Sequence, residues 1–260
     1  MTVPTPLLDF FKRGEVAHDV RLLAAQGGLA TRAHEQLAIL VLLLEDPDAE
    51  VRRLADATLN RIPAEALQAF LARSDVSIGL REFFADRGVF PSEIPTIVDE
   101  EPLVEAPELD ENFDENEEEE TRDSAFQRVA KMGFTQRLKA AVKGTREMRA
   151  ILIRDPNKMI TAAVLSSPKL SEPEVESFAA MGSVSEDVLR IIGNNRAWMK
   201  NYAITLRLVK NPKTPLAMSM NMMARLQDRD VTQLSVDRNV PEPLRVAARK
   251  RIVAATSGKR

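Results

Sequence analysis

The chain has no cysteine, and only two histidines, one tryptophan and one tyrosine among its 260 residues. The absence of cysteine excludes disulfides and thiolate metal sites, and it is compatible with a reducing compartment. Long runs of valine, isoleucine, threonine and tyrosine, which favour sheets, are also missing. The most apolar run, residues 37–44, is too short to cross a bilayer, and the N-terminus lacks the pattern of a secretory signal. We therefore expect an all-α, cytoplasmic protein without a membrane segment.

Motifs that carry catalysis are missing as well. His18 and His34 lie on different predicted helices, and neither has acidic residues beside it at metal-ligand spacing. The sequence has no glycine-rich phosphate loop and no Gly-x-Ser-x-Gly turn. A DNA glycosylase built from helical repeats would need paired aromatic residues and a buried aspartate, and Trp198 is the only tryptophan. We expect no enzyme, cofactor or metal site, and we interpret both histidines as surface or helix-packing residues.

Charge divides the chain into three segments, although the net charge is only −3. Residues 1–90 carry ten basic and thirteen acidic side chains, residues 91–124 carry one and fifteen, and residues 125–260 carry twenty-five and eleven. This asymmetry says more than the total charge. It predicts an N-terminal helical module over 1–90, an acidic linker over 91–124 and a basic helical module over 125–260.

The acidic linker is expected to be disordered, because so polar a segment cannot bury enough apolar surface to offset its chain entropy. Apolar residues are nevertheless interleaved with the acids, at Ile97, Val98, Leu103, Val104, Leu109 and Phe113. Two interpretations stay open. The segment is a solubilising spacer, or it contains a short motif that docks on a basic groove of this molecule or of another.

The sequence of the basic segment contains an internal repeat with a period of about 56 residues. Ile153-Arg154-Asp155-Pro156 falls on Val209-Lys210-Asn211-Pro212. Other apolar positions repeat at the same spacing, and a weaker half-period of about 28 residues runs inside each unit. Helix-length apolar runs separated by proline and asparagine predict one helical hairpin for each half-period. Stacked hairpins of this kind form an α-solenoid.

Several short stretches of the sequence resemble known families of helical-repeat proteins. The stretch from Asp46 to Ala55 resembles the turn and second helix of HEAT-type repeats, and the stretch from Val240 to Ala248 is similar to the leucine-rich repeat variant and HEAT-like superhelical folds. The stretches 143–158, 198–202 and 210–215 resemble a group of uncharacterised bacterial proteins. The resemblance covers 125–255 and, more loosely, 1–90. It implies an α-solenoid for macromolecular contact and no catalytic residues. The iron–sulfur cluster of some variants needs cysteine, so it does not carry over.

Candidate contact residues come from two patterns. The stretch 194–202 holds the only tryptophan, the only tyrosine, two cations and three amides, which indicates either core packing or a partner hot spot. A second pattern is the basic excess, which indicates either solvated helix faces and helix-end partners or a stripe for an anionic ligand. The predicted partner-binding residues are Arg146, Arg149, Arg154, Arg196, Trp198, Lys200, Tyr202, Lys210, Lys213, Arg249 and Lys250.

Methionines at 218, 220, 222 and 223 form a third group, which suits core filling or a flexible apolar surface. Together these patterns predict a non-enzymatic adaptor whose basic solenoid binds an acidic or amphipathic segment of a protein partner, or its own linker. The alternative is a nucleic-acid-binding protein that uses the basic helical repeats.

Overall fold

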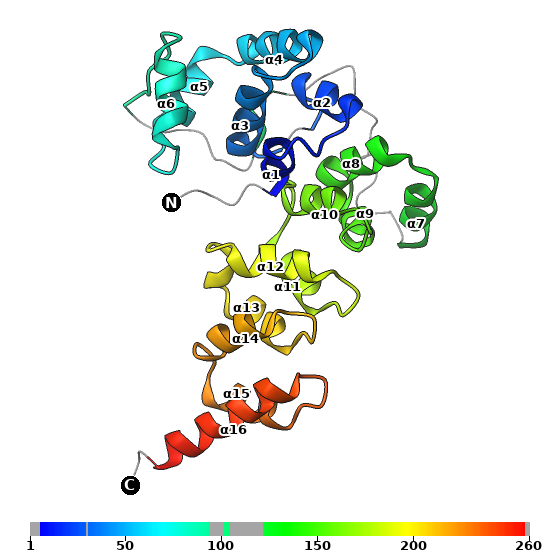
Figure 1. The fold of residues 1–260 in the computed structure, drawn as a ribbon, viewed down its shortest axis with the longest axis vertical. Helices are drawn as coiled ribbons and strands as arrows, with labels where there is room; N and C mark the ends of the chain where they lie inside the picture. Colours follow the sequence, from blue (N-terminus) through cyan, green and yellow to red (C-terminus); the bar gives the residue numbers. More distant parts are fainter. Residues whose placement is uncertain (1–5, 30, 94–100, 105–121, 258–260) are drawn as a thin grey trace. The chain divides into compact units, whose positions relative to one another are not determined.

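A computed structural model describes residues 6–29, 31–93, 101–104 and 122–257 (Figure 1). Within these ranges the chain forms sixteen α-helices and no strand, which confirms the all-helical class predicted from the sequence. The helices are short, from 7 to 16 residues. Among the described helices, none is long and apolar enough to cross a membrane.

The chain divides into two compact units, residues 1–170 and 171–260. The first contains α1 (Pro6–Lys12), α2 (His18–Ala25), α3 (Ala33–Leu43), α4 (Ala49–Arg61), α5 (Ala64–Leu71), α6 (Ile78–Ala85), α7 (Arg122–Lys131), α8 (Phe134–Lys143), α9 (Arg146–Leu152) and α10 (Lys158–Leu165). The second contains α11 (Glu172–Ala180), α12 (Glu186–Asn194), the 3₁₀ helix η2 (Trp198–Lys200), α13 (Tyr202–Lys210), α14 (Leu216–Met223), α15 (Asp228–Val236) and α16 (Glu242–Ser257).

This division differs from the expected modules 1–90 and 125–260, because α7–α10 pack into the first unit. The reason lies in α10, where every residue from Met159 to Leu165 is buried. A helix that is apolar all round needs neighbours on all sides. It contacts α8 and α9, and α1 covers it further. The sequence pattern places α10 among the repeats, and its burial places it in the core of the first unit.

Helix α3 lies at the centre of the N-terminal helices, against α1, α2 and α4. Its apolar residues Leu37 and Leu40 are fully buried, and so are Leu7 on α1 and Phe70 on α5. Burial of such side chains contributes about 1.5–3 kcal/mol each to folding. The first unit therefore has a contiguous apolar core that holds α3 rigidly.

Helix starts follow the capping residues of the sequence. The Asp48 side chain accepts the backbone N–H of Glu50 (2.7 Å) at the start of α4. Ser171 and Glu174 form a capping box at α11, in which Glu174 Oε2 accepts the N–H of Ser171 (3.0 Å). Such caps satisfy amides that have no partner within the helix. In short helices this matters, because orphan groups are a large share of the backbone.

The second unit arranges its helices in two rows. In one row α11 bonds to α13 through Glu172 and Asn201 (2.9 Å), and α13 bonds to α15 through Tyr202 and Asp230. In the other row α12 and α14 meet where Met218 lies against Gly193, and α14 contacts α16. Consecutive helices thus alternate between these two sets of contacts.

Helix starts repeat at the spacing of the sequence pattern. Helices α9, α11 and α12 begin at 146, 172 and 186, and α13, α15 and α16 begin 56 residues later, at 202, 228 and 242. Residues that match in the sequence also match in burial: Ile153 and Val209 are both buried, as are Val175 and Val231. Helix starts and the burial of these positions therefore recur at the spacing of the sequence pattern.

Candidate functional site

Both histidines have structural surroundings. His18 is exposed, and its Nε2 lies 2.9 Å from Oδ2 of Asp48, the residue that caps α4. The backbone N–H of Glu50 and the His18 ring lower the pKa of Asp48. His34 is buried and faces the ring of Phe70, with the centroids 6.4 Å apart. Within the described residues, no three side chains of the metal-ligating types lie together.

Glu35 on α3 is the buried carboxyl that the sequence did not single out. Its Oε1 accepts the N–H groups of Leu7 (2.8 Å) and Leu8 (3.3 Å), so it caps α1 from another helix. Burial raises the pKa of Glu35 to about 7, and the Ser166 hydroxyl, the two amides and Arg32 partly offset this effect. A perturbed carboxyl is a frequent mark of an active site. Here both donors are helix amides, so we assign Glu35 a structural role.

The aromatic cluster lies within the hairpin packing of the second unit. Trp198 is 6% exposed, so it is a core residue. Tyr202 is half-buried; its hydroxyl donates to Asp230 and accepts the N–H of Gln227 (3.1 Å). Desolvation raises the pKa of Tyr202, and the bond to Asp230 adds to it. Of the two interpretations left open by the sequence, the structure fits core packing for Trp198.

Several predicted contact cations donate hydrogen bonds to backbone carbonyls. Arg149 is buried and donates to the carbonyl of Gly144 (2.7 Å), at the end of α8. Lys213 donates to Val184 (3.1 Å) and Arg249 to Ser235 (3.2 Å). Gly144 and Ser235 lie at the ends of α8 and α15, where carbonyls have no partner within the helix and cations interact well with the helix dipole. Val184 lies in the turn before α12. The expectation that Arg149 and Trp198 belong to a contact surface is therefore corrected.

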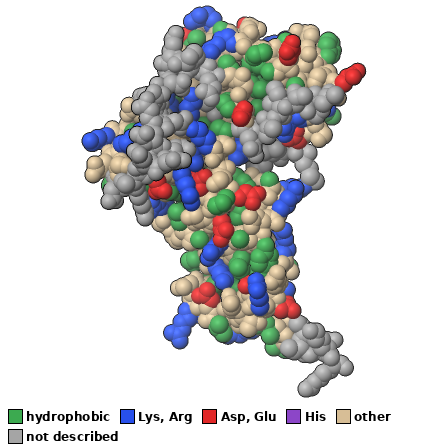
Figure 2. Space-filling view, turned by 180° about the vertical axis from the view of Figure 1, so that it is seen from behind, with side chains coloured by type: hydrophobic (Ala, Val, Ile, Leu, Met, Phe, Trp, Pro, Cys, Tyr) green, Lys and Arg blue, Asp and Glu red, His purple; other side chains and the backbone are tan. Residues whose placement is uncertain are grey.

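The remaining predicted residues have mixed surroundings. Lys210 is half-buried and donates to the side chain of Gln233 (3.3 Å), and Arg154 is also half-buried. The exposed members of the set are Arg146, Arg196, Lys200, Lys213, Arg249 and Lys250. In the space-filling view, acidic side chains lie among the lysines and arginines on the visible face of the second unit (Figure 2). The methionine group is also mixed, since Met222 and Met223 are buried and Met218 and Met220 are half-buried.

Positive charge is densest in α7–α10. Residues 125–170 carry ten lysines and arginines against two acidic residues, whereas residues 171–260 carry fifteen against nine. One of the two acids, Asp155, pairs with Arg137. Side chains exposed to solvent include Arg128 and Lys131 on α7 and Arg146 on α9, two helices that pack together. We call Arg128, Lys131 and Arg146 the α7–α9 cationic surface.

A second feature that the sequence pattern did not indicate is the contact between Gln36 and residues 101–104. Residues 101–104, four residues of the expected linker, lie along α3. Gln36 is buried, and its Oε1 accepts the N–H groups of Leu103 (2.8 Å) and Val104 (3.2 Å). Its Nε2 donates to the carbonyl of Val104. The apolar residues of the linker indicated a docking motif, but the expected groove was basic, and this one is not. The other apolar linker residues noted lie outside the described residues.

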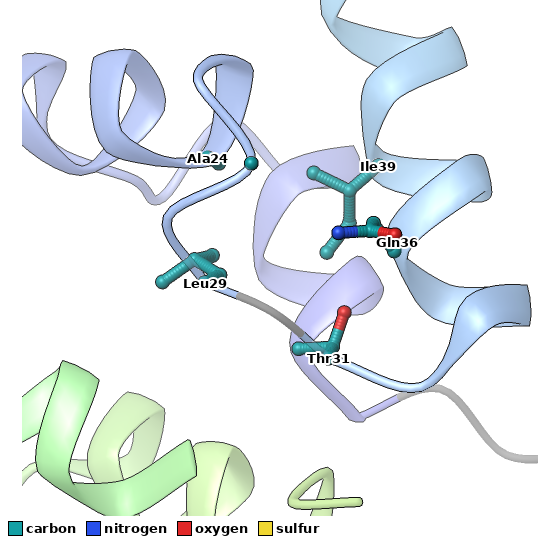
Figure 3. Close-up of a pocket in the computed structure, with 6 residues that line it drawn as sticks. Ala24, Leu29, Thr31, Gln36 and Ile39 are labelled. Carbon is teal, nitrogen blue, oxygen red and sulfur yellow. The ribbon is translucent and has the colours of Figure 1, made fainter. Parts of the chain in front are cut away.

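Next to Gln36 a small hollow opens between the end of α2 and α3. It is lined by Ala24, Gly27, Leu29, Thr31, Gln36 and Ile39. In the close-up, Leu29 lies on the loop after α2, and Gln36 and Ile39 lie on α3 (Figure 3). The lining is mostly apolar, with the Gln36 amide and the Thr31 hydroxyl as its polar groups. This hollow and the residues that bind 101–104 together form the α2–α3 groove.

These local geometries do not point to a known relative. No protein-family model, curated protein or solved structure matches this chain.

Proposed function

We propose that this chain is a non-enzymatic interaction protein, an adaptor whose helical hairpins bind an acidic or amphipathic segment of a protein partner. The observation that carries the proposal is the α7–α9 cationic surface, where exposed lysines and arginines belong to a stretch of sequence, residues 125–170, with only two acidic residues. Surfaces with a single sign of charge attract ligands of the opposite sign. The chain itself supplies one such ligand, since fifteen acidic residues lie in 91–124, immediately before this region.

The hairpins of the second unit support an α-solenoid of the HEAT-like or leucine-rich-repeat-variant kind as the architecture of this adaptor. Helices alternate between two rows, and each contacts near neighbours in the sequence. Arrays of this type serve mainly as extended binding surfaces. In this proposal the acidic linker competes with the partner for the cationic surface.

The test uses the full chain from which residues 110–120 have been deleted, with a fluorescent peptide of residues 107–121 as the probe. At about 50 mM salt we expect saturable binding, which weakens in the triple variant R128E/K131E/R146E by at least tenfold. The matched control is R53E/R61E, which reverses two exposed charges on α4. Absence of binding, or equal weakening by the control, would refute the acidic-segment proposal.

Nucleic acid is the second candidate, because the same density of cations suits a phosphate backbone. That function requires binding of a DNA or RNA duplex whose affinity falls steeply as salt rises. It also requires tighter binding by the chain that lacks residues 110–120 than by the full chain, because the acidic segment screens the surface. If the anisotropy of a fluorescently labelled duplex does not change when the protein is added at about 50 mM salt, this alternative is excluded.

A further inference from the structure

Residues 101–104 lie on α3 as a bound peptide lies on a receptor. The carbonyl of Glu101 accepts the N–H of Ala33 (3.1 Å), the first residue of α3. First-turn amides have no partner within a helix, and Arg32, which precedes α3, makes no side-chain cap. The segment therefore fills a hydrogen-bonding vacancy that α3 itself leaves.

Gln36 then holds the main chain two and three residues further on. Its carboxamide oxygen accepts from Leu103 and Val104, and its nitrogen donates to Val104. A carboxamide that binds both the N–H and the C=O of one residue reproduces the pairing of a neighbouring β-strand. All these bonds go to main-chain atoms, so they select an extended backbone and not a particular side chain.

The opposite wall of the groove is shaped by Gly27. This residue has φ +81°, a conformation in which other residues are strained. A Cβ built there would lie 3.5 Å from the carbonyl oxygen of Val104 and 3.7 Å from its Cγ1. Val104 thus lies directly against the loop after α2, and the same Cβ would lie 3.5 Å from the Thr58 methyl group on α4. This contact favours an aliphatic side chain at the position of Val104.

Among the described residues, one polar group of the groove has no hydrogen bond while residues 101–104 are in place. The Thr31 side chain is 1% exposed and lines the hollow, and its hydroxyl has no hydrogen-bond partner among the described residues. Leu103 and Val104 are only half-buried. Buried polar groups in native proteins are nearly always hydrogen-bonded, and an unbonded one destabilises the state that contains it. A ligand that reaches this hydroxyl therefore has an advantage over residues 101–104.

We propose that the α2–α3 groove is a docking site for an extended peptide of a partner protein, one with two adjacent aliphatic residues at the positions of Leu103 and Val104. Residues 101–104 occupy it in cis and are displaced by that peptide. The tethered segment itself shows the class, since Leu103 and Val104 are adjacent aliphatic residues. This site uses neither the residues nor the charges of the α7–α9 cationic surface. The two proposals are therefore independent, and one can be refuted while the other stands.

The probe for this site is a fluorescent peptide of residues 99–106, added to the full-length protein. In the wild type the tethered segment competes at an effective concentration in the millimolar range, so binding is weak. The double variant L103D/V104D removes the competitor, and we expect it to bind the probe at least tenfold more tightly. Adding Q36A to that variant should cost at least tenfold. The matched control, I97D/V98D, makes the same chemical change nearby and should bind as the wild type does.

Equal affinity of the wild type and L103D/V104D for the probe, or binding that Q36A leaves intact, would overturn the proposal. If L103D/V104D does not fold, amide exchange in the wild type decides. Excess unlabelled peptide should accelerate exchange of the Leu103 and Val104 amides, and unchanged rates overturn the proposal. A dimer in the wild type that L103D/V104D dissolves would identify a second copy of the chain as the occupant, and that outcome also overturns it.

Discussion

Replacing Glu35 by glutamine tests the buried carboxyl that caps α1. In the folded protein its pKa is about 7, against an ordinary value of 4.5. Between these two pH values the folded state keeps a proton that the unfolded state has lost, so stability falls as pH rises through this window. A shift of this size corresponds to about 3 kcal/mol. Glutamine keeps an oxygen for the amides of Leu7 and Leu8 and does not titrate.

We therefore expect E35Q to gain stability relative to the wild type as pH rises from about 4.5 to about 8, by about 3 kcal/mol in total. In thermal melts this corresponds to about 6–12 °C. Circular dichroism measures it, since helices of both units contribute to that spectrum, and Trp198 fluorescence provides a reference from the second unit. The matched control is E65Q, an exposed glutamate in the first turn of α5.

The decisive quantity is the difference between E35Q and the wild type at each pH, because all other titrations cancel in it. If that difference is the same at about pH 5 and about pH 8, then Glu35 does not carry a raised pKa, and the inference that burial perturbs it is wrong. If E65Q shows the same dependence on pH, the effect belongs to the net charge and not to burial.

Two further substitutions test packing and turn chemistry, each by urea unfolding. Gly144→Ala places a Cβ 2.3 Å from the carbonyl oxygen of Ala140, and we expect a loss of at least about 2 kcal/mol; Gly182→Ala, which meets nothing within 4 Å, should change stability by less than about 1 kcal/mol. Equal effects would contradict the close contact. Asn211→Ala removes bonds from its amide to two carbonyls at the end of α11 (2.9 and 3.0 Å) and should cost about 2–3 kcal/mol, whereas Asn239→Ala, at an exposed turn position, should cost under about 0.5 kcal/mol. A neutral Asn211→Ala would show that these bonds do not stabilise the turn.

The turns show how much local sequence can predict. Asp155 accepts the N–H of Asn157 (2.8 Å), and Asn211 accepts that of Lys213 (3.0 Å), 56 residues later. Side chains of aspartate and asparagine bind the backbone two residues on, so this part of each turn is specified by local sequence. For this reason the positions of helices and turns in the repeats follow from the sequence. The position of residues 101–104 could not be predicted from local sequence, because the docking of Leu103 depends on Gln36, which is 67 residues away.

The predicted contact residues show what the sequence pattern could not predict, namely which cations are exposed. A cation near a helix end and a cation in an open binding surface have the same sequence pattern. Arg149 differs from Arg146 only in lying on the face of α9 that is turned toward the end of α8. Which face is covered depends on how neighbouring helices pack, and single-sequence periodicity fixes spacing without fixing the neighbour.

The sequence by itself determined the helical class, the period of the hairpins and the segregation of charge, because these depend on residue spacing, capping chemistry and composition along the chain. Tertiary structure alone decided that α7–α10 join the N-terminal helices, that Glu35 is buried with a raised pKa, and that Gln36 holds residues 101–104. Each of these features joins groups that lie far apart in the chain. Their energies come from desolvation and from hydrogen bonds that exist only after the helices have packed.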